Sequence, residues 1–233
     1  MSSQMDIDYG GRIPLPRVRA DARAAVLDEI VGIQLDFEAG ASLEHPASDA
    51  PGHLASLSLV SIVAEELVDG DVTTALQAQV TWMALWPGIP EMLAIGIAFG
   101  GAAADRNRLD MLRLDARAQA RGLSLDEYIA RLREADAMPR SPFVRMFRGE
   151  TRRAPSEERI ERGLTVLDET LALVPTLQRP PLLCTSAWLH WARGRWGEAM
   201  LHLAEAARIE PRHELAYGLS IRLSELTPAW LAE

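Results

Sequence analysis

Lysine is absent from this chain of 233 residues, so all 24 of its basic residues are arginine. A lysine that forms a Schiff base with a substrate is therefore excluded, and so is the lysine of a phosphate-binding loop. Cysteine is almost absent as well, because Cys184 is the only one. An internal disulfide and a zinc site built from several cysteines are excluded for the same reason.

Long apolar runs are missing too. The most apolar stretch, residues 92–104, contains three glycines and lies between Glu91 and Asp105. A membrane-spanning helix needs about 20 apolar residues, so this stretch predicts a buried core helix. No basic segment followed by an apolar one opens the sequence, which argues against a signal peptide. We therefore predict a cytoplasmic protein without membrane contact, although a secreted protein without disulfides would have the same composition.

Positive charge is scarce and unevenly placed. The net charge is −9, and clustered positive charge is what neutralises nucleic-acid phosphates, so general nucleic-acid binding is not expected. One basic stretch interrupts this pattern, with two phenylalanines inside it. Its arginines are Arg140, Arg145, Arg148, Arg152 and Arg153. The stretch is a candidate for contacting phosphates, but the favoured interpretation is a solvated interdomain linker, or one that pairs with the acidic N-terminal part.

Helical periodicity and proline or glycine breaks dominate the rest of the chain. They predict a mostly all-α protein, built as a multi-helix array. Residues 54–62 are ambiguous, because alternation favours a short strand and the following residues favour a helix. The predicted organisation is an extended arm (1–18), an N-terminal helical domain (19–138), a basic linker (139–155) and a C-terminal helical domain (156–233).

The segment 182–210 has the pattern of a helical hairpin. A small residue, a bulky residue four positions later and a terminal proline follow the tetratricopeptide signature. The matching residues are Ala199, Leu203, Ala206 and Pro211. Small residues let two antiparallel helices approach closely, and the proline ends the second helix. The segment therefore resembles a single tetratricopeptide hairpin, whereas a stable solenoid needs about three repeats.

A second resemblance covers roughly residues 165–230. The residues that carry it are Pro180, Pro181, Leu182, Leu183, Ala187, Trp188, Leu189, Gly194, Ala199, Ala206, Pro211, Leu226, Thr227 and Pro228. They resemble the C-terminal region of a domain-of-unknown-function family common in actinobacteria. The resemblance implies a helical architecture and a bacterial, cytosolic setting, and it implies no activity.

The tetratricopeptide register places three side chains on a concave face. Cys184, Trp188 and Trp191 would line the groove of the hairpin, where exposed tryptophan is typical of peptide recognition. The alternative is that both tryptophans pack against the helix predicted over residues 156–174.

Motifs that would indicate catalysis are weak. Glu198 and His202 have helical spacing, but no H-E-x-x-H pattern provides further metal ligands. We therefore expect no catalytic residue, cofactor or metal. The favoured hypothesis is a non-enzymatic scaffold or adaptor that binds a protein partner, or a second copy of itself, through the hairpin groove. The alternatives are an enzyme with a dispersed site and a nucleic-acid-associated regulator that uses the basic stretch.

Overall fold

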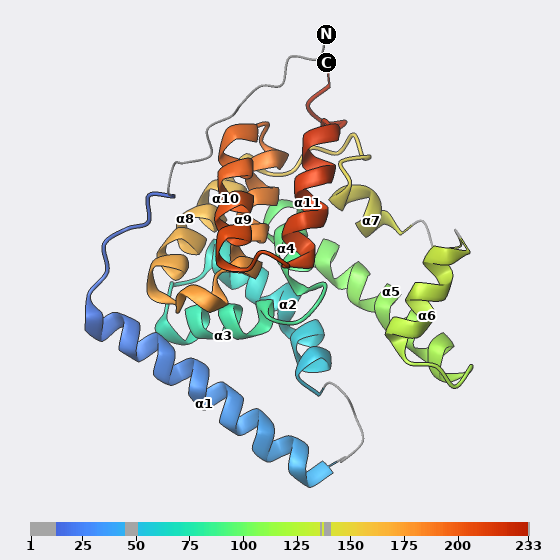
Figure 1. Ribbon diagram of the computed structural model, residues 1–233, viewed down its shortest axis with the longest axis horizontal. Helices are drawn as coiled ribbons and strands as arrows, with labels where there is room; N and C mark the ends of the chain where they lie inside the picture. Colours follow the sequence, from blue (N-terminus) through green and yellow to red (C-terminus); the bar gives the residue numbers. More distant parts are fainter. Residues whose placement is uncertain (1–12, 45–50, 136, 138–140, 233) are drawn as a thin grey trace.

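The computed structural model describes residues 13–44, 51–135, 137 and 141–232, and within them every regular element is helical (Figure 1). The helices are α1 (Ala20–Glu44), α2 (Pro51–Asp69), α3 (Thr74–Ala84), α4 (Ile89–Phe99), α5 (Gly101–Gln119), α6 (Leu125–Glu134), α7 (Pro142–Phe147), α8 (Glu157–Leu173), α9 (Pro180–Ala192), α10 (Trp196–Ile209) and α11 (Glu214–Glu225), with a 3₁₀ turn η1 (Thr176–Gln178) before α9. The predicted all-α, multi-helix array is confirmed. None of the helices in these residues has the length and apolar character that a membrane crossing requires.

Local signals placed several helix ends correctly. Residues 54–62 belong to α2, so the ambiguity between strand and helix is resolved in favour of the helix. The Ser124 hydroxyl accepts from the Glu127 N–H while the Glu127 carboxylate accepts from the Ser124 N–H, which makes a reciprocal capping box. The Ser156 hydroxyl accepts from the N–H of Arg159 at the start of α8. Of the expected arm, residues 1–12 lie outside the described residues.

Helix α4 forms the centre of the molecule, and all of its residues except Glu91 are buried. It packs against α2, α5, α8 and α9. Glycines allow two of these contacts to be close. A Cβ on Gly96 would lie 2.6 Å from the Cβ of Ala64 in α2, and a Cβ on Gly163 of α8 would overlap the side chain of Ile97. Residues 92–99 of the apolar stretch are therefore part of a buried core helix, as predicted, whereas Gly100 ends that helix and residues 101–104 begin α5.

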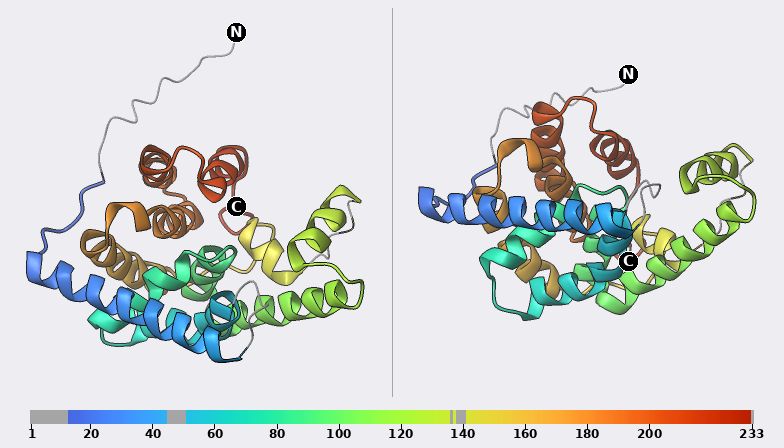
Figure 2. Two further views of the ribbon diagram at one scale, coloured as in Figure 1. Left: turned by 60° about the horizontal axis from the view of Figure 1, so that its bottom comes forward. Right: turned by 90° about the horizontal axis from the view of Figure 1, so that it is seen from below.

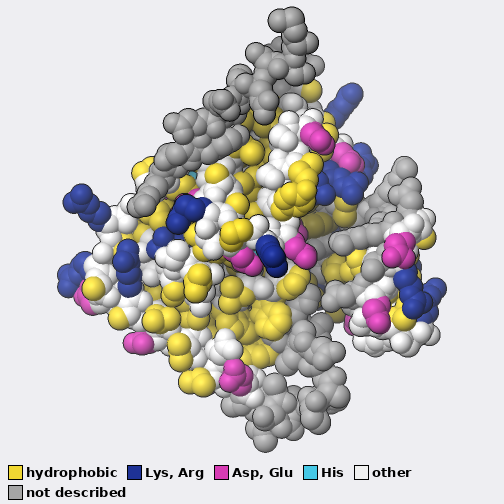
Figure 3. Space-filling view, viewed as in Figure 1, with side chains coloured by type: hydrophobic (Ala, Val, Ile, Leu, Met, Phe, Trp, Pro, Cys, Tyr) yellow, Lys and Arg dark blue, Asp and Glu magenta, His cyan; other side chains and the backbone are white. Residues whose placement is uncertain are grey.

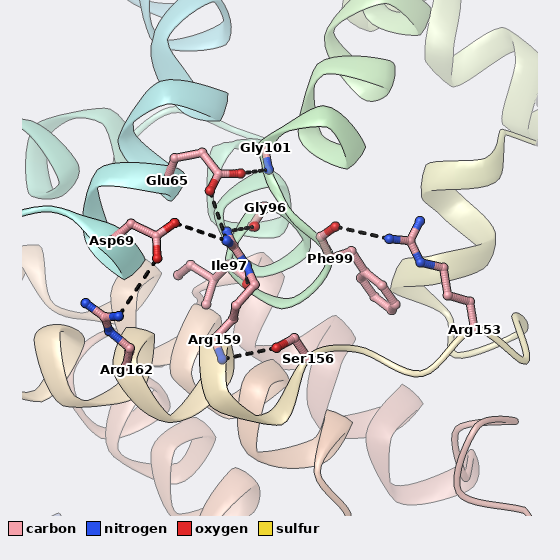
Figure 4. A network of polar contacts seen from close by, with 10 residues as sticks. All are labelled: Glu65, Asp69, Gly96, Ile97, Phe99, Gly101, Arg153, Ser156, Arg159 and Arg162. Carbon is pink, nitrogen blue, oxygen red and sulfur yellow. Dashed lines mark hydrogen bonds and ion pairs between the residues drawn. The ribbon is translucent and has the colours of Figure 1, made fainter.

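The carboxyl end of α4 is capped by residues far along the chain (Figure 4). Arg159 donates from Nε to the Ile97 carbonyl at 2.9 Å and from Nη2 to the Gly96 carbonyl at 3.2 Å. The Ser156 N–H donates to the Ala98 carbonyl at 2.9 Å. Arg153 reaches the Phe99 carbonyl at 3.5 Å. The Gly96 carbonyl also accepts from the Gly100 N–H at 2.9 Å, whereas the carbonyls of residues 97–99, which have no partner at an ideal helix end, are satisfied by residues 153–159.

Carboxylates of α2 complete this network. Glu65 receives Arg159 Nη1 at 2.9 Å and also accepts from the N–H of Gly101, the first residue of α5. Asp69 lies 3.5 Å from the same guanidinium nitrogen. Burial acts to raise the pKa of Glu65, but the Gly101 N–H and the Arg159 guanidinium outweigh it and lower the pKa. One arginine and one glutamate therefore join α2, α4, α5 and α8.

The part of the expected linker (139–155) that the structure describes, residues 141–155, is not a solvated connection throughout. It contains α7, whose Phe143, Met146 and Phe147 are buried. One hydrophobic core includes these side chains together with residues of α1, α4 and α11. Leu114, Ala118 and Tyr128 form a separate small cluster between α5 and α6. Figure 1 shows these two helices extending away from the main body.

Replacement of Arg159 tests the cap on α4. We expect Arg159→Met to lower the free energy of unfolding by about 2–4 kcal/mol, because two carbonyls and Glu65 lose a charged donor together. Chemical denaturation followed by circular dichroism measures this change. Arg162→Met is the matched control, since Arg162 lies 3.9 Å from Asp69 and is half exposed; a loss of similar size in both variants would contradict the capping role.

Candidate functional site

The three side chains predicted to line an open groove are buried. Cys184 is 1% exposed, and Trp188 and Trp191 are both 0% exposed. The reason is that every residue of α9 is buried, with α4, α8, α10 and α11 packed around the helix. The expectation that these side chains face an open concave surface is therefore wrong.

The tryptophans instead hold other segments of the chain. Trp188 Nε1 donates to the Phe147 carbonyl at 2.8 Å, and its ring stacks on Phe147 with centroids 5.7 Å apart. Trp191 Nε1 donates to the Leu226 carbonyl at 3.0 Å. Trp230, which follows α11, donates from its Nε1 to the Ala192 carbonyl at 2.8 Å. This aromatic cluster fixes α7 and the segment after α11 onto α9.

Cys184 lies beside a histidine but is not an activated nucleophile. Its Sγ is 3.7 Å from Nδ1 of His213, and that nitrogen also accepts from the Ala216 N–H at the start of α11. Burial, followed by the nearby Glu91 and Glu210 carboxylates, raises the pKa of the Cys184 thiol. A thiol that stays protonated at neutral pH lacks the thiolate that attacks substrates or binds metals.

A second histidine pair lies between α9 and α10. The rings of His190 and His202 have centroids 4.8 Å apart. His202 Nδ1 is 2.8 Å from the Glu198 carbonyl, so the spacing of Glu198 and His202 seen in the sequence serves a backbone contact. Burial first, and then the neighbouring His202, lowers the pKa of His190 to about 3. Across the residues that the structure describes, no three histidine, cysteine or acidic side chains gather as a metal site.

The arginines of the basic stretch, residues 140–153, do not share one environment. Arg140 lies outside the described residues, and Arg145 and Arg152 are exposed. Arg153 is committed to α4, since its guanidinium carbon lies 5.8 Å from the centre of the Phe99 ring and a guanidinium nitrogen contacts the Phe99 carbonyl. Arg148 lines a hollow in the surface.

This hollow, which we call the α11 hollow, lies between the end of α7 and the outer face of α11. Its volume is about 350 Å³, and its lining consists of Arg148, Glu150, Gly218, Ile221, Arg222, Glu225 and Leu226. Figure 3 shows acidic and basic side chains gathered beside α11 on the side that faces α7. The hollow therefore combines charges of both signs with two exposed apolar side chains.

The turn that carries Arg148 and Glu150 packs against Trp191 and the segment after α11. Gly149 has a φ of +72°, and a Cβ there would lie 2.6 Å from the Trp191 ring and 3.0 Å from Cα of Pro228. Its carbonyl accepts from the Ala229 N–H at 2.7 Å. Glycine is thus required at this position, both for the backbone conformation and for space. The neighbouring side chains point from a rigid turn into the hollow.

Arg222 is the most unusual group in the α11 hollow. It is half-buried, and its guanidinium carbon lies 5.8 Å from the centre of the Phe147 ring. Burial and then the positive charge of Arg148 lower the pKa of Arg222, while Glu91 and Glu150 oppose the change. Its guanidinium makes no hydrogen bond or close ion pair with any side chain or carbonyl of the described residues. The sequence did not indicate Arg222, because a single arginine in an amphipathic helix is ordinarily solvated.

No protein-family model, curated protein or solved structure matches this chain. The resemblance of its C-terminal part to a tetratricopeptide hairpin and to an actinobacterial family therefore stays a prediction.

The buried histidine pair predicts a loss of stability in mild acid. His190 has a pKa near 3 in the folded chain and about 6.5 when unfolded. The unfolded chain therefore binds more protons between these values, and the free energy of unfolding falls as pH drops below about 6.5, by up to about 1.4 kcal/mol per pH unit. The measurement is chemical denaturation of the wild type and of His190→Gln at several pH values from neutral to mildly acidic. Subtracting the free energy of unfolding of the variant from that of the wild type cancels the contribution of the carboxylates. If this difference does not change with pH, the prediction is contradicted.

Proposed function

We propose that this protein is a non-enzymatic helical adaptor that binds a carboxylate-bearing segment of a partner protein in the α11 hollow. The observation that supports this most directly is Arg222, a half-buried guanidinium whose donors are not used by the described residues. An arginine in this state has already lost part of its hydration, so a ligand that binds it displaces less water than at an open surface.

The chemistry of the α11 hollow favours a single carboxylate. The flat guanidinium of Arg222 offers a pair of parallel donors that match the two oxygens of a carboxylate, and its contact with Phe147 limits its movement. Arg148 adds a second positive charge at the same hollow, 3.9 Å from the carboxylate of Glu150. Glu150 and Glu225 also line it, and they would repel a chain of phosphates more strongly than one acidic side chain. Nucleic acid is therefore the less favoured ligand.

The apolar part of the α11 hollow favours a peptide over a small anion. Ile221 and Leu226 are exposed beside Arg222. A peptide with an aspartate or glutamate next to a leucine, isoleucine or phenylalanine would fill both kinds of surface. Binding sites of this type are fixed by a few anchoring residues, and arginine is common among them.

Two further features belong to the same proposal. The α9–α10 hairpin serves as a tetratricopeptide-like support, because buried Ala199 and Ala206 line the face of α10 that packs on the core. A cytoplasmic location is the setting in which we expect the adaptor to work, in line with its single cysteine.

Short synthetic peptides test the α11 hollow. We expect peptides with one acidic residue beside a leucine, isoleucine or phenylalanine to bind, and amide analogues to bind at least about tenfold more weakly, since a charge-assisted contact contributes about 1.5–3 kcal/mol. Arg222→Gln should weaken binding of the acidic peptides to the level of the amides. Calorimetric titration gives both affinities.

Arg145→Gln is the matched control, because Arg145 is exposed on α7 and does not line the hollow. It should bind the acidic peptides as the wild type does. Equal binding of acid and amide peptides would overturn the proposal. Tight binding of a single-stranded oligonucleotide that falls steeply with salt and depends on Arg145 would favour the nucleic-acid alternative.

A further inference from the structure

Helix α1 carries apolar side chains on two faces, and the fold covers only one of them. Val26 and Ile30 are buried, and Ile33 and Phe37 pack against the same core. Figure 2 shows α1 lying along the outside of the molecule. The covered face therefore accounts for the attachment of α1 to the body, and a separate set of apolar residues is left outside.

The outer apolar residues form one stripe. Leu27, Val31 and Leu35 are 41%, 48% and 59% exposed. Residues four apart lie on the same side of a helix. Ala20 and Ala24 extend the stripe toward the start of α1, so that its members are spaced by four, three, four and four residues and share one side of the helix. Surface helices of monomeric proteins usually present polar residues on this side.

We propose that the outer face of α1 binds the same face of a second copy of this chain, with the two helices antiparallel and Val31 at the twofold axis. A self-complementary contact of this kind is the commonest form of protein dimer. With Val31 opposite itself, Leu27 of each copy lies opposite Leu35 of the other, so the three large apolar side chains of the stripe cover one another.

The charges along α1 favour this antiparallel arrangement. Before Leu27, α1 and the segment that leads to it carry Arg17, Arg19 and Arg23 and one acid, Asp21, which lies 2.8 Å from Arg19 of the same copy. Every charged residue from 28 to 38 is acidic. Antiparallel pairing about Val31 sets Glu38 opposite Ala24 of the other copy, next to Arg23, which keeps its positive charge while its Nε donates to the Ala172 carbonyl of its own copy at 3.1 Å. Parallel pairing would set acidic residues against acidic residues, which is unfavourable.

The seam lies away from the α11 hollow, since Figure 1 places α1 on one side of the molecule and α11 and α7 on another. A dimer formed through α1 would leave both hollows open and make the proposed adaptor bivalent. The dimer itself rests on α1 alone and does not depend on the proposed function.

Sedimentation measures the dimer directly. The wild-type mass should rise from that of one chain, 25.6 kDa, toward twice that value as concentration increases. Val31→Asp should abolish the rise, because it places two like charges at the axis. Leu177→Asp is the control, as Leu177 is 81% exposed outside the seam and its replacement should leave the dimer unchanged. Circular dichroism confirms that each variant is folded.

Cross-linking tests the register. Under oxidation Val31→Cys should form a disulfide-linked dimer, since the two introduced thiols face each other at the axis. Asp36→Cys, exposed on the same helix but outside the stripe, should cross-link much more slowly. A wild type that remains monomeric at every concentration, as it would if another part of the chain covered the stripe, overturns the proposal. A dimer unaffected by Val31→Asp, or equal cross-linking of the two cysteine variants, also overturns it.

Discussion

The carbonyl groups at the end of α4 impose the constraint on which the rest of this fold depends. Because α4 is buried along nearly all of its length, its last turn lies where bulk water does not easily provide hydrogen bonds, and each unsatisfied group would cost about 1–3 kcal/mol. Arg159, Ser156 and Arg153 provide the donors. This requirement fixes α8 against α4, and through Glu65 it also fixes the end of α2 and the start of α5.

A second set of contacts builds outward from that centre. The indole nitrogens of Trp188, Trp191 and Trp230 each donate to a backbone carbonyl of a different segment. Phe147 is held by the first of these bonds and also lies beside the guanidinium of Arg222. The aromatic cluster that buries the predicted groove therefore also positions Phe147 beside Arg222, one of the residues that line the α11 hollow.

Local sequence patterns predicted the helices but could not show which faces meet. The capping signals at Ser124 and Ser156 depend on residues three positions away, and both are present in the structure. The burial of Trp188 depends on packing that its own segment does not reveal. A usable signal did exist, because α9 is apolar on every side, which is typical of a helix buried on all sides.

The long-range features had no comparable signal. Nothing near Arg159 distinguishes it from the other arginines, since its partners at Gly96 and Ile97 are 63 and 62 residues away. The sequence around Arg222 likewise does not distinguish it from other arginines in amphipathic helices. Both residues were missed because their roles arise only when segments distant in sequence come together.

The distance between α4 and its cap has a consequence for synthesis on the ribosome. The first five helices contain the apolar centre of the molecule, yet the donors for α4 come 54 to 63 residues later. A nascent chain that has reached α6 already has α4 but lacks Arg159, so the last carbonyls of α4 must bond to water and the apolar face that α8 and α9 later cover is exposed. The packing around α4 therefore stays incomplete until α8 has emerged, and the exposed apolar face can bind chaperones until then.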